Sequence, residues 1–260
     1  MDAPLPPALW NALGFGDPGD GRARVVAIVG GGGKTALAYR LGWEAAALGR
    51  RAMVTGTTRF TRLAPMPPLV EAAPDAILGR AEAAWQPGQP LVLAGMEAQT
   101  KGRLAPLACE TVDALARTEG IGLIAVEADG SRMRAFKAPG DDEPVIPASA
   151  THVVAVVGAS ILDAPLDAEH VHRPERVRAI VDREVCDATL IAAVLASPTG
   201  GRKSSEGRPF AVVVNQADVD EAGAARLGRA VLAAGVGRVV VASLQDAARP
   251  VREVLTTAEV

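Results

Sequence analysis

The stretch of this sequence best suited to chemistry is four consecutive glycines followed by a lysine and a threonine, Gly30-Gly31-Gly32-Gly33-Lys34-Thr35. Glycines let backbone N–H groups converge on an anion because no Cβ stands in the way, and a helix start adds partial positive charge. The Lys34 ammonium can reach the β- and γ-phosphates of a nucleotide, and the Thr35 hydroxyl can hold Mg²⁺. The stretch therefore predicts a site for GTP or ATP with Mg²⁺.

The spacing within this stretch differs from that of an ordinary P-loop. Position 28 is Ile, and the loop from Gly30 is about two residues shorter than the usual pattern. We therefore expect the phosphates to sit differently. The alternative is a tight turn between a strand and a helix, but such a turn needs only one or two glycines and no Lys-Thr pair.

Two carboxylates follow a second hydrophobic run, Gly122 to Val126. Glu127 and Asp129 come directly after it, where nucleotide hydrolases that carry a P-loop place the acid that binds Mg²⁺. We expect Thr35 and Asp129 to hold the metal and Glu127 to orient water, with Lys34 completing the catalytic set. The alternative is a pair of solvated loop acids.

Two further strand ends carry polar side chains. Thr57 and Thr58 follow the predicted strand 51–55, and they could contact the γ-phosphate or its metal because ligands collect at this edge of open α/β sheets; the alternative is a capped, threonine-rich loop. Asn215 and Asp218 follow the strand 210–214. A carboxylate there can accept both N–H groups of a guanine edge, which favours guanine, although Gln216 replaces the usual Lys. The alternative is an Asx cap of the next helix.

These residues need a sheet whose strands end at a common edge. Hydrophobic strands alternate with helical patterns, which predicts an α/β fold with a three-layer, mainly parallel sheet resembling a P-loop NTPase. Strands are expected at 24–29, 51–55, 90–94, 122–126, 151–158, 210–214 and 238–241. No domain-length linker interrupts residues 1–260, so we expect one domain with a loop-rich insertion around 60–110 and a lid-like loop at 130–150.

Composition narrows the classes of function. The chain has 260 residues, 49% of them hydrophobic, and a formal net charge of −3, so nothing favours nucleic acid as a partner. No run approaches the ~18 apolar residues of a membrane span, and residues 1–10 do not resemble a signal peptide, so we expect no membrane contact and a cytoplasmic protein. Cys109 and Cys186 lack zinc-ligand spacing, whereas His170 and His172 are either a metal pair or packing residues.

Several motifs resemble the YqeC family, whose members are described as accessory proteins of selenium-dependent molybdenum hydroxylases. They are Val29-Gly30-Gly31-Gly32-Gly33-Lys34-Thr35, Val54-Thr55-Gly56-Thr57-Thr58, Glu127-Ala128-Asp129-Gly130-Ser131-Arg132, Lys137-Ala138-Pro139, Glu143-Pro144-Val145-Ile146-Pro147 and His172-Arg173-Pro174-Glu175. The sequence departs from the family pattern at Gly56, inside the threonine run, and at Gln216. The resemblance implies a nucleotide-binding fold and a role in maturing a molybdenum enzyme.

The first functional hypothesis is a nucleoside-triphosphate-binding accessory protein, a slow Mg²⁺-dependent GTP or ATP hydrolase, whose partner is a molybdenum hydroxylase or its cofactor. The second is a small-molecule kinase or nucleotidyl transferase in which the loop 133–147 closes over a pterin-type acceptor. Lys137, within this loop, either neutralises phosphate or substrate charge or is a surface residue. The third is a non-catalytic adaptor.

Overall fold

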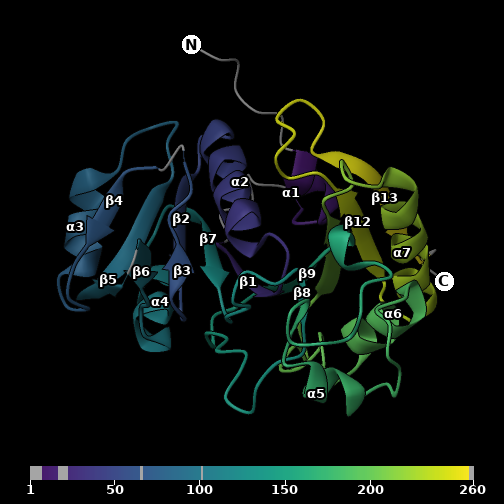
Figure 1. Cartoon of the computed structure of the whole chain (residues 1–260). Helices are drawn as coiled ribbons and strands as arrows, with labels where there is room; N and C mark the ends of the chain where they lie inside the picture. The colour runs from purple at the N-terminus through teal and green to yellow at the C-terminus, as the bar shows by residue number, and fades with distance from the viewer. Residues whose placement is uncertain (1–7, 17–22, 65–66, 101, 258–260) are drawn as a thin grey trace. The chain divides into compact units, whose positions relative to one another are not determined.

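The computed structural model describes residues 8–16, 23–64, 67–100 and 102–257. Contacts group the chain into two compact units, which we describe separately. The first comprises residues 1–28, 35–128 and 145–152, and the second comprises residues 29–34, 129–144 and 153–260. The elements are labelled in Figure 1. The expected single domain over 1–260 stays a prediction.

The first unit contains a mostly parallel sheet. Strand β7 (Ile121–Glu127) pairs in parallel with β1 (Arg24–Gly30) and with β2 (Arg51–Gly56), and β2 pairs in parallel with β5 (Leu91–Thr100). The strands β4 (Leu69–Glu71), β6 (Arg103–Ala105) and β3 (Phe60–Thr61) continue from β5. Because the register sets both Ile28 and Gly56 opposite Glu127, the segments that follow β1, β2 and β7 leave the sheet at the same level.

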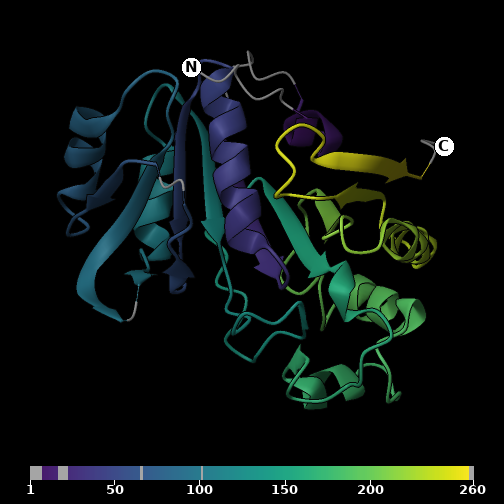
Figure 2. The same cartoon turned by 45° about the horizontal axis from the view of Figure 1, so that its top comes forward.

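The helices of the first unit are α1 (Ala8–Ala12), α2 (Lys34–Ala47), α3 (Ile77–Ala84) and α4 (Cys109–Ala116). Helix α2 can be followed in Figure 2 from its start just after the glycine run. It packs closely on β2, since a Cβ at Gly42 would lie 3.0 Å from Val54. The buried Glu44 carboxylate of α2 accepts the backbone N–H groups of Leu9 and Trp10, which fixes α1.

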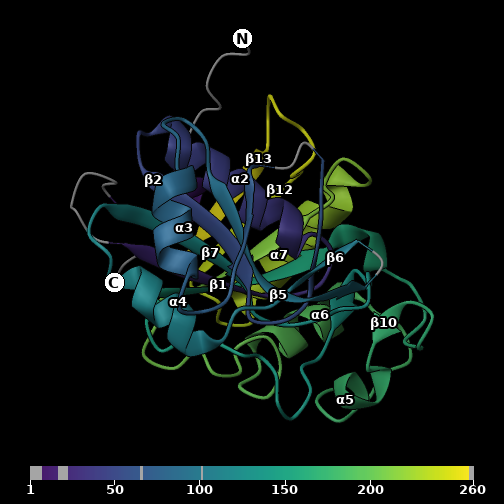
Figure 3. The same ribbon diagram turned by 90° about the vertical axis from the view of Figure 1, so that its left-hand side faces the viewer.

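The second unit contains mostly parallel strands. Strand β11 (Phe210–Asn215) pairs in parallel with β9 (His152–Gly158) and with β12 (Arg238–Ala242), and β13 (Val251–Thr256) adds an antiparallel edge. Helices α6 (Ala188–Ala196) and α7 (Glu221–Ala233) begin at the aspartate caps Asp187 and Asp220. A two-stranded sheet joins β8 (Phe136–Lys137) to β10 (Val171–His172), which leads directly into α5 (Pro174–Arg178) (Figure 3).

The sequence predicted the strands β1, β2, β5, β7, β9, β11 and β12 but not β13, and the fold is a mixed, mostly parallel α/β sheet with helices, as expected. The strand expected at 90–94 is longer than predicted, because β5 extends to Thr100, and β6 begins at Arg103, which pairs with Thr100 in antiparallel fashion. Within the region 130–150, which was expected as a lid-like loop, the structure contains the short strand β8. No helix among the described residues combines the length and the apolar character that crossing a membrane requires.

Candidate functional site

The glycine run bends sharply between β1 and α2 and belongs to the second unit. Gly30, Gly32 and Gly33 adopt φ values of 94°, 75° and 135°, which other residues rarely reach. The loop is also closely surrounded, since a Cβ at Gly30 would lie 2.3 Å from the carbonyl oxygen of Val156. Both facts require glycine, because a side chain would collide with a neighbouring backbone.

Three backbone amides of the loop bind acceptors of the protein itself. Gly30 N–H donates to Asp129 Oδ2 at 3.0 Å, Gly31 N–H donates to the carbonyl of Val156 at 2.9 Å, and Gly32 N–H donates to the carbonyl of Arg134 at 3.1 Å. These are the amides that the sequence suggested for phosphate binding. In this conformation they are used to fasten the loop.

Lys34 is buried at the start of α2, with 4% of its surface exposed. Its Nζ donates to the carbonyl of Gly30 at 2.7 Å and lies 3.3 Å from Asp129 Oδ1. The Lys34 ammonium thus joins the start of α2 to the first glycine of the loop. A buried lysine requires such partners, because desolvation of an unpaired ammonium costs several kcal/mol.

Asp129 connects two lysines from different parts of the second unit. Its Oδ2 lies 3.0 Å from Nζ of Lys137, a β8 residue whose side chain is 1% exposed. Among the described residues, Asp129 Oδ1 has no hydrogen-bond partner, although the Lys34 ammonium lies beside it. Lys137 also donates to the carbonyl of Gly130 at 2.6 Å. Lys137 is therefore part of the buried interior, which excludes the surface lysine that the sequence left open.

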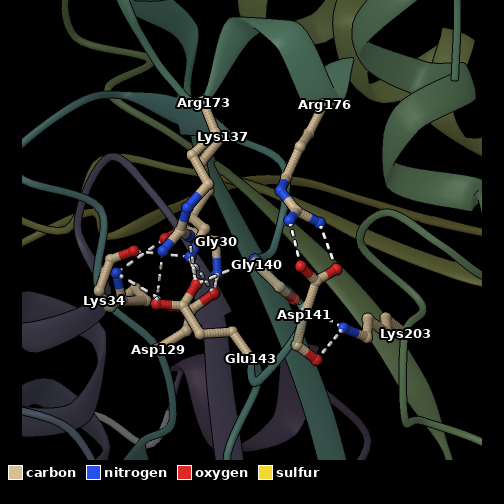
Figure 4. Close-up of polar contacts among 11 residues, drawn as sticks. Gly30, Lys34, Asp129, Lys137, Gly140, Asp141, Glu143, Arg173, Arg176 and Lys203 are labelled. Atoms are coloured by element: carbon tan, nitrogen blue, oxygen red, sulfur yellow. Dashed lines mark hydrogen bonds and ion pairs between the residues drawn. The ribbon is translucent and has the colours of Figure 1, made fainter. Parts of the chain in front are cut away.

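Glu143 and Arg173 extend this arrangement. Glu143 Oε2 accepts from Lys137 Nζ at 2.5 Å and from Arg173 Nη1 at 2.6 Å. Burial alone would raise the pKa of Glu143, but the hydrogen bonds from Arg173 and Lys137 outweigh it and lower that pKa to about 2. We call Lys34, Asp129, Lys137, Glu143 and Arg173 the ion cluster (Figure 4).

A second set of contacts holds the loop that carries Glu143. Asp141 receives both guanidinium nitrogens of Arg176, at 2.8 and 2.6 Å, and Lys203 Nζ donates to the carbonyls of Gly140 and Asp141 at 2.6 and 2.8 Å (Figure 4). A cavity of about 10 Å³ is lined in part by Lys137, Asp129 and the two prolines that flank this loop, Pro139 and Pro144. That volume holds about one water molecule.

The first unit places a hydroxyl and a carboxylate together. Thr35 Oγ1 donates to Glu127 Oε2 at 2.6 Å, and Glu127 is 5% exposed. The backbone N–H of Thr57 donates to the carbonyl of Glu127, whereas its hydroxyl donates to the carbonyl of Val145. Among the described residues, Thr58 Oγ1 is buried without a hydrogen-bond partner. Glu127, rather than Asp129, is thus the acid hydrogen-bonded to the Thr35 hydroxyl.

The strand end at Asn215 joins three segments of the second unit. Asn215 Nδ2 donates to the carbonyl of Gly32 at 2.7 Å, and its Oδ1 accepts the N–H of Leu244 at 3.0 Å. Asp218 is exposed, and its Oδ1 accepts the hydroxyl of the buried Ser243 at 2.5 Å. These contacts tie the glycine loop to the turn that begins at Ser243.

Histidine and cysteine residues do not assemble a metal centre in the described part of the chain, where no three His, Cys, Asp or Glu side chains group together. His170 instead lies 2.8 Å from Asp167. Burial, followed by the charges of Arg173 and Lys137, lowers the pKa of His172 to about 4.

The fold and these contacts describe an α/β protein whose glycine loop joins a strand to a helix that begins with Lys-Thr. A family model described as YqeC protein matches residues 26–175. The Escherichia coli (strain K12) protein printed as "Uncharacterized protein YqeC" is 32% identical over 196 residues, which cover 70% of this chain and 72% of the relative. The chain belongs to the YqeC family. The matched range contains the whole ion cluster, whereas Asn215 and Asp218 lie beyond it.

Proposed function

We propose that this protein binds a guanine nucleoside triphosphate with Mg²⁺ and hydrolyses it slowly. The phosphates would lie at Gly30 to Lys34, and the base at Asp218. One observation carries the proposal: the buried Asn215 amide bridges the glycine loop and the Ser243 turn, with the exposed Asp218 three residues further along the chain. One side chain thereby joins the proposed phosphate loop to the turn whose Ser243 hydroxyl binds the proposed base-binding carboxylate.

Base preference follows from the chemistry of Asp218. An ionised carboxylate only accepts hydrogen bonds, and guanine offers adjacent N1–H and N2–H donors that one carboxylate can accept together. Adenine presents an acceptor at N1, which would face the carboxylate repulsively. The Ser243 hydroxyl occupies one side of Oδ1 and thereby holds the carboxylate in one orientation. Guanine is therefore favoured over adenine.

Phosphate binding requires the loop to exchange partners. Lys34 now neutralises Asp129 and binds the carbonyl of Gly30, and the Gly30 N–H binds the same carboxylate. A triphosphate supplies stronger acceptors than a carbonyl oxygen, so these donors can turn to it without losing hydrogen bonds. Nucleotide binding then includes a rearrangement of the loop, which slows both association and turnover.

Thr35 and Glu127 are the residues best suited to the nucleotide's magnesium ion. Mg²⁺ prefers oxygen ligands and usually keeps several waters, so a hydroxyl and a carboxylate 2.6 Å apart are an appropriate pair. We therefore transfer the metal role from Asp129 to Glu127, and we assign Asp129 to fastening the loop. Thr57 and Thr58, which follow β2 at the same level as Glu127, are retained as candidates for the γ-phosphate side.

The cellular role that we propose is maturation of a selenium-dependent molybdenum hydroxylase. Its support is the role that the motif resemblance to the YqeC family implies, and the chain belongs to that family. Nucleotide hydrolysis would time the interaction with the hydroxylase or with its cofactor. Co-purification of the hydroxylase with the GTP-bound protein, and its release after hydrolysis, would test this role.

The test of the binding proposal is a change of base specificity. Asp218→Asn replaces one acceptor oxygen with an NH₂ donor, which suits the C2 carbonyl of xanthine instead of the amino group of guanine. We expect GTP affinity to fall about 100-fold and XTP affinity to rise by a similar factor, as for the loss of a charge-assisted pair. Asp182→Asn, an exposed substitution elsewhere in the second unit, should change neither. Equal binding of GTP and ATP by the native protein would refute the proposal.

A further inference from the structure

Within the ion cluster, the carboxylate of Glu143 occupies a site built for a larger anion. Three donors converge on Glu143 Oε2: Lys137 Nζ at 2.5 Å, Arg173 Nη1 at 2.6 Å and the Gly140 N–H at 3.3 Å. Arg173 Nη2 adds a contact to Oε1 at 3.3 Å. An arginine fork, a lysine and a backbone amide are the donors with which proteins bind phosphate.

Backbone features of two residues serve this arrangement. Arg173 has a φ of 63°, an unfavourable value for a residue with a side chain, at the position immediately before α5. Gly140 lies against the guanidinium, since a Cβ there would be 3.1 Å from Arg173 Cζ. The chain thus accepts local strain at Arg173, and a side chain at position 140 would press against the guanidinium.

The charge balance of the cluster favours a dianion over the glutamate. Lys34, Lys137 and Arg173 contribute three positive charges, and Asp129 and Glu143 contribute two negative ones, so the cluster carries +1. Moving Glu143 into solvent would leave +2 around Asp129. A phosphate monoester, whose charge near neutral pH is between −1.5 and −2, would neutralise that excess.

From these contacts we infer that Lys137 and Arg173 form a second anion subsite, which receives the phosphate group of a small phosphorylated substrate when Glu143 leaves it. The cavity of about 10 Å³ lined by Lys137, Pro139 and Pro144 is too small for a phosphate, so the ligand enters only by displacing the glutamate. The Glu143 side chain is 17% exposed and Arg173 is 28% exposed, so this corner of the cluster is open to solvent, whereas Lys137 lies beneath it.

The loop that carries Glu143 is attached in a way that permits this displacement. Besides the contacts of Glu143, the loop is held by the exposed pair of Asp141 with Arg176 and by the contacts of Lys203 with two backbone carbonyls. Val145, at the far end of the loop, is anchored separately by hydrogen bonds of its backbone N–H and carbonyl. Exposed ion pairs contribute only about 0–1 kcal/mol, so the loop can move at small cost once the glutamate is replaced. The subsite rests on the proposed function in one respect: it is called the second because the proposed nucleotide site is counted as the first.

The test uses inorganic phosphate as the probe and isothermal titration calorimetry as the measurement. Glu143→Gln keeps the shape of the side chain but removes its charge, so phosphate should bind about tenfold more tightly than to the native protein, a change of about 1.4 kcal/mol. The double variant Glu143→Gln with Arg173→Gln should lose the gain. Glu184→Gln, an equivalent substitution at an exposed ion pair with Arg178, should stay within twofold of the native protein.

A second measurement needs no substitution of Glu143. Saturating phosphate should increase amide hydrogen exchange in residues 139–145 of the native protein, because the displaced loop loses its anchor, and it should have no such effect in Arg173→Gln. The subsite is refuted if Glu143→Gln binds no more tightly than the native protein, if the gain survives without Arg173, or if exchange is unchanged.

GTP binding is measured on the same samples, which separates this subsite from the proposed nucleotide site. A gain in phosphate affinity without GTP binding would refute the nucleotide site alone. GTP binding without the gain would refute the second subsite alone.

Discussion

Lys137→Met provides a quantitative test of the ion cluster, because Lys137 is the cation that contacts both carboxylates. Its side chain is 1% exposed, and its Nζ donates to Gly130, pairs with Asp129 at 3.0 Å and pairs with Glu143 at 2.5 Å. Methionine fills a similar volume without the charge. The substitution therefore removes three polar contacts while preserving most of the packing.

The cost follows from what the substitution leaves behind. Removing one partner of a buried ion pair typically costs about 3–5 kcal/mol, because the other charge stays buried without compensation. Here Asp129 keeps the Gly30 N–H and Lys34, and Glu143 keeps Arg173, so we expect the lower end of that range, about 3 kcal/mol. A double-mutant cycle with Asp129→Asn should give a coupling of about 1–3 kcal/mol.

The assay must report on the second unit. All three tryptophans, Trp10, Trp43 and Trp85, belong to the first unit, so their fluorescence does not follow the cluster directly. Amide hydrogen exchange of β9 and β11 during urea unfolding reports on the ion cluster, because both strands belong to the second unit. Arg176→Gln, which breaks the exposed pair with Asp141, is the matched control and should cost less than about 1 kcal/mol. Equal costs for Lys137→Met and this control would refute the idea that a buried cluster stabilises the unit.

Three further predictions concern other parts of the molecule. Asn215→Ala should lower the free energy of unfolding by about 2–3 kcal/mol in urea titrations, because two buried backbone groups lose their partner, and a cost below 0.5 kcal/mol would contradict this. Burial, then the charge of Arg24, lowers the pKa of His152 to about 4, so between pH 6.5 and 4 the unfolded state binds more protons than the folded state. The free energy of unfolding should therefore fall by about 1–2 kcal/mol as the pH is lowered from 6.5 to 4. His152→Asn should not show this fall. Thr35→Val should abolish the gain in GTP affinity that Mg²⁺ gives the native protein, and a persisting gain would exclude a metal held by Thr35 with Glu127.

The long strands were predictable because burial on both faces of a parallel sheet demands continuous runs of Val, Ile and Leu, as in β1, β7 and β9. The edge strand β13 was not predictable, since its exposed positions carry Arg252 and Glu253 and its partner strand supplies the hydrogen bonds. Short strands such as β8 likewise depend on distant partners, because two residues carry no periodic signal.

The candidate site was only partly predictable for the same reason. Sequence reasoning selected Lys34, Glu127 and Asp129, because acids and a lysine at strand ends are informative wherever the sheet brings them. It could not tell that Glu127 contacts Thr35 whereas Asp129 contacts the lysines, since that depends on the direction in which each side chain leaves the backbone. Arg173 lay within a quoted motif, but its contact with Glu143 spans 30 residues of sequence.

We propose that the glycine loop and Lys34 bind the phosphates of a guanine nucleotide. Calorimetric titration of Mg²⁺ with a nonhydrolysable GTP analogue into the native protein and into Lys34→Ala tests this binding, with circular dichroism confirming that both proteins are folded. We expect saturable one-to-one binding to the native protein and a loss of about 10–100-fold in affinity in the variant, as for a hydrogen bond to a charged group. Absence of binding to the native protein, or equal affinity in the two proteins, would contradict the account.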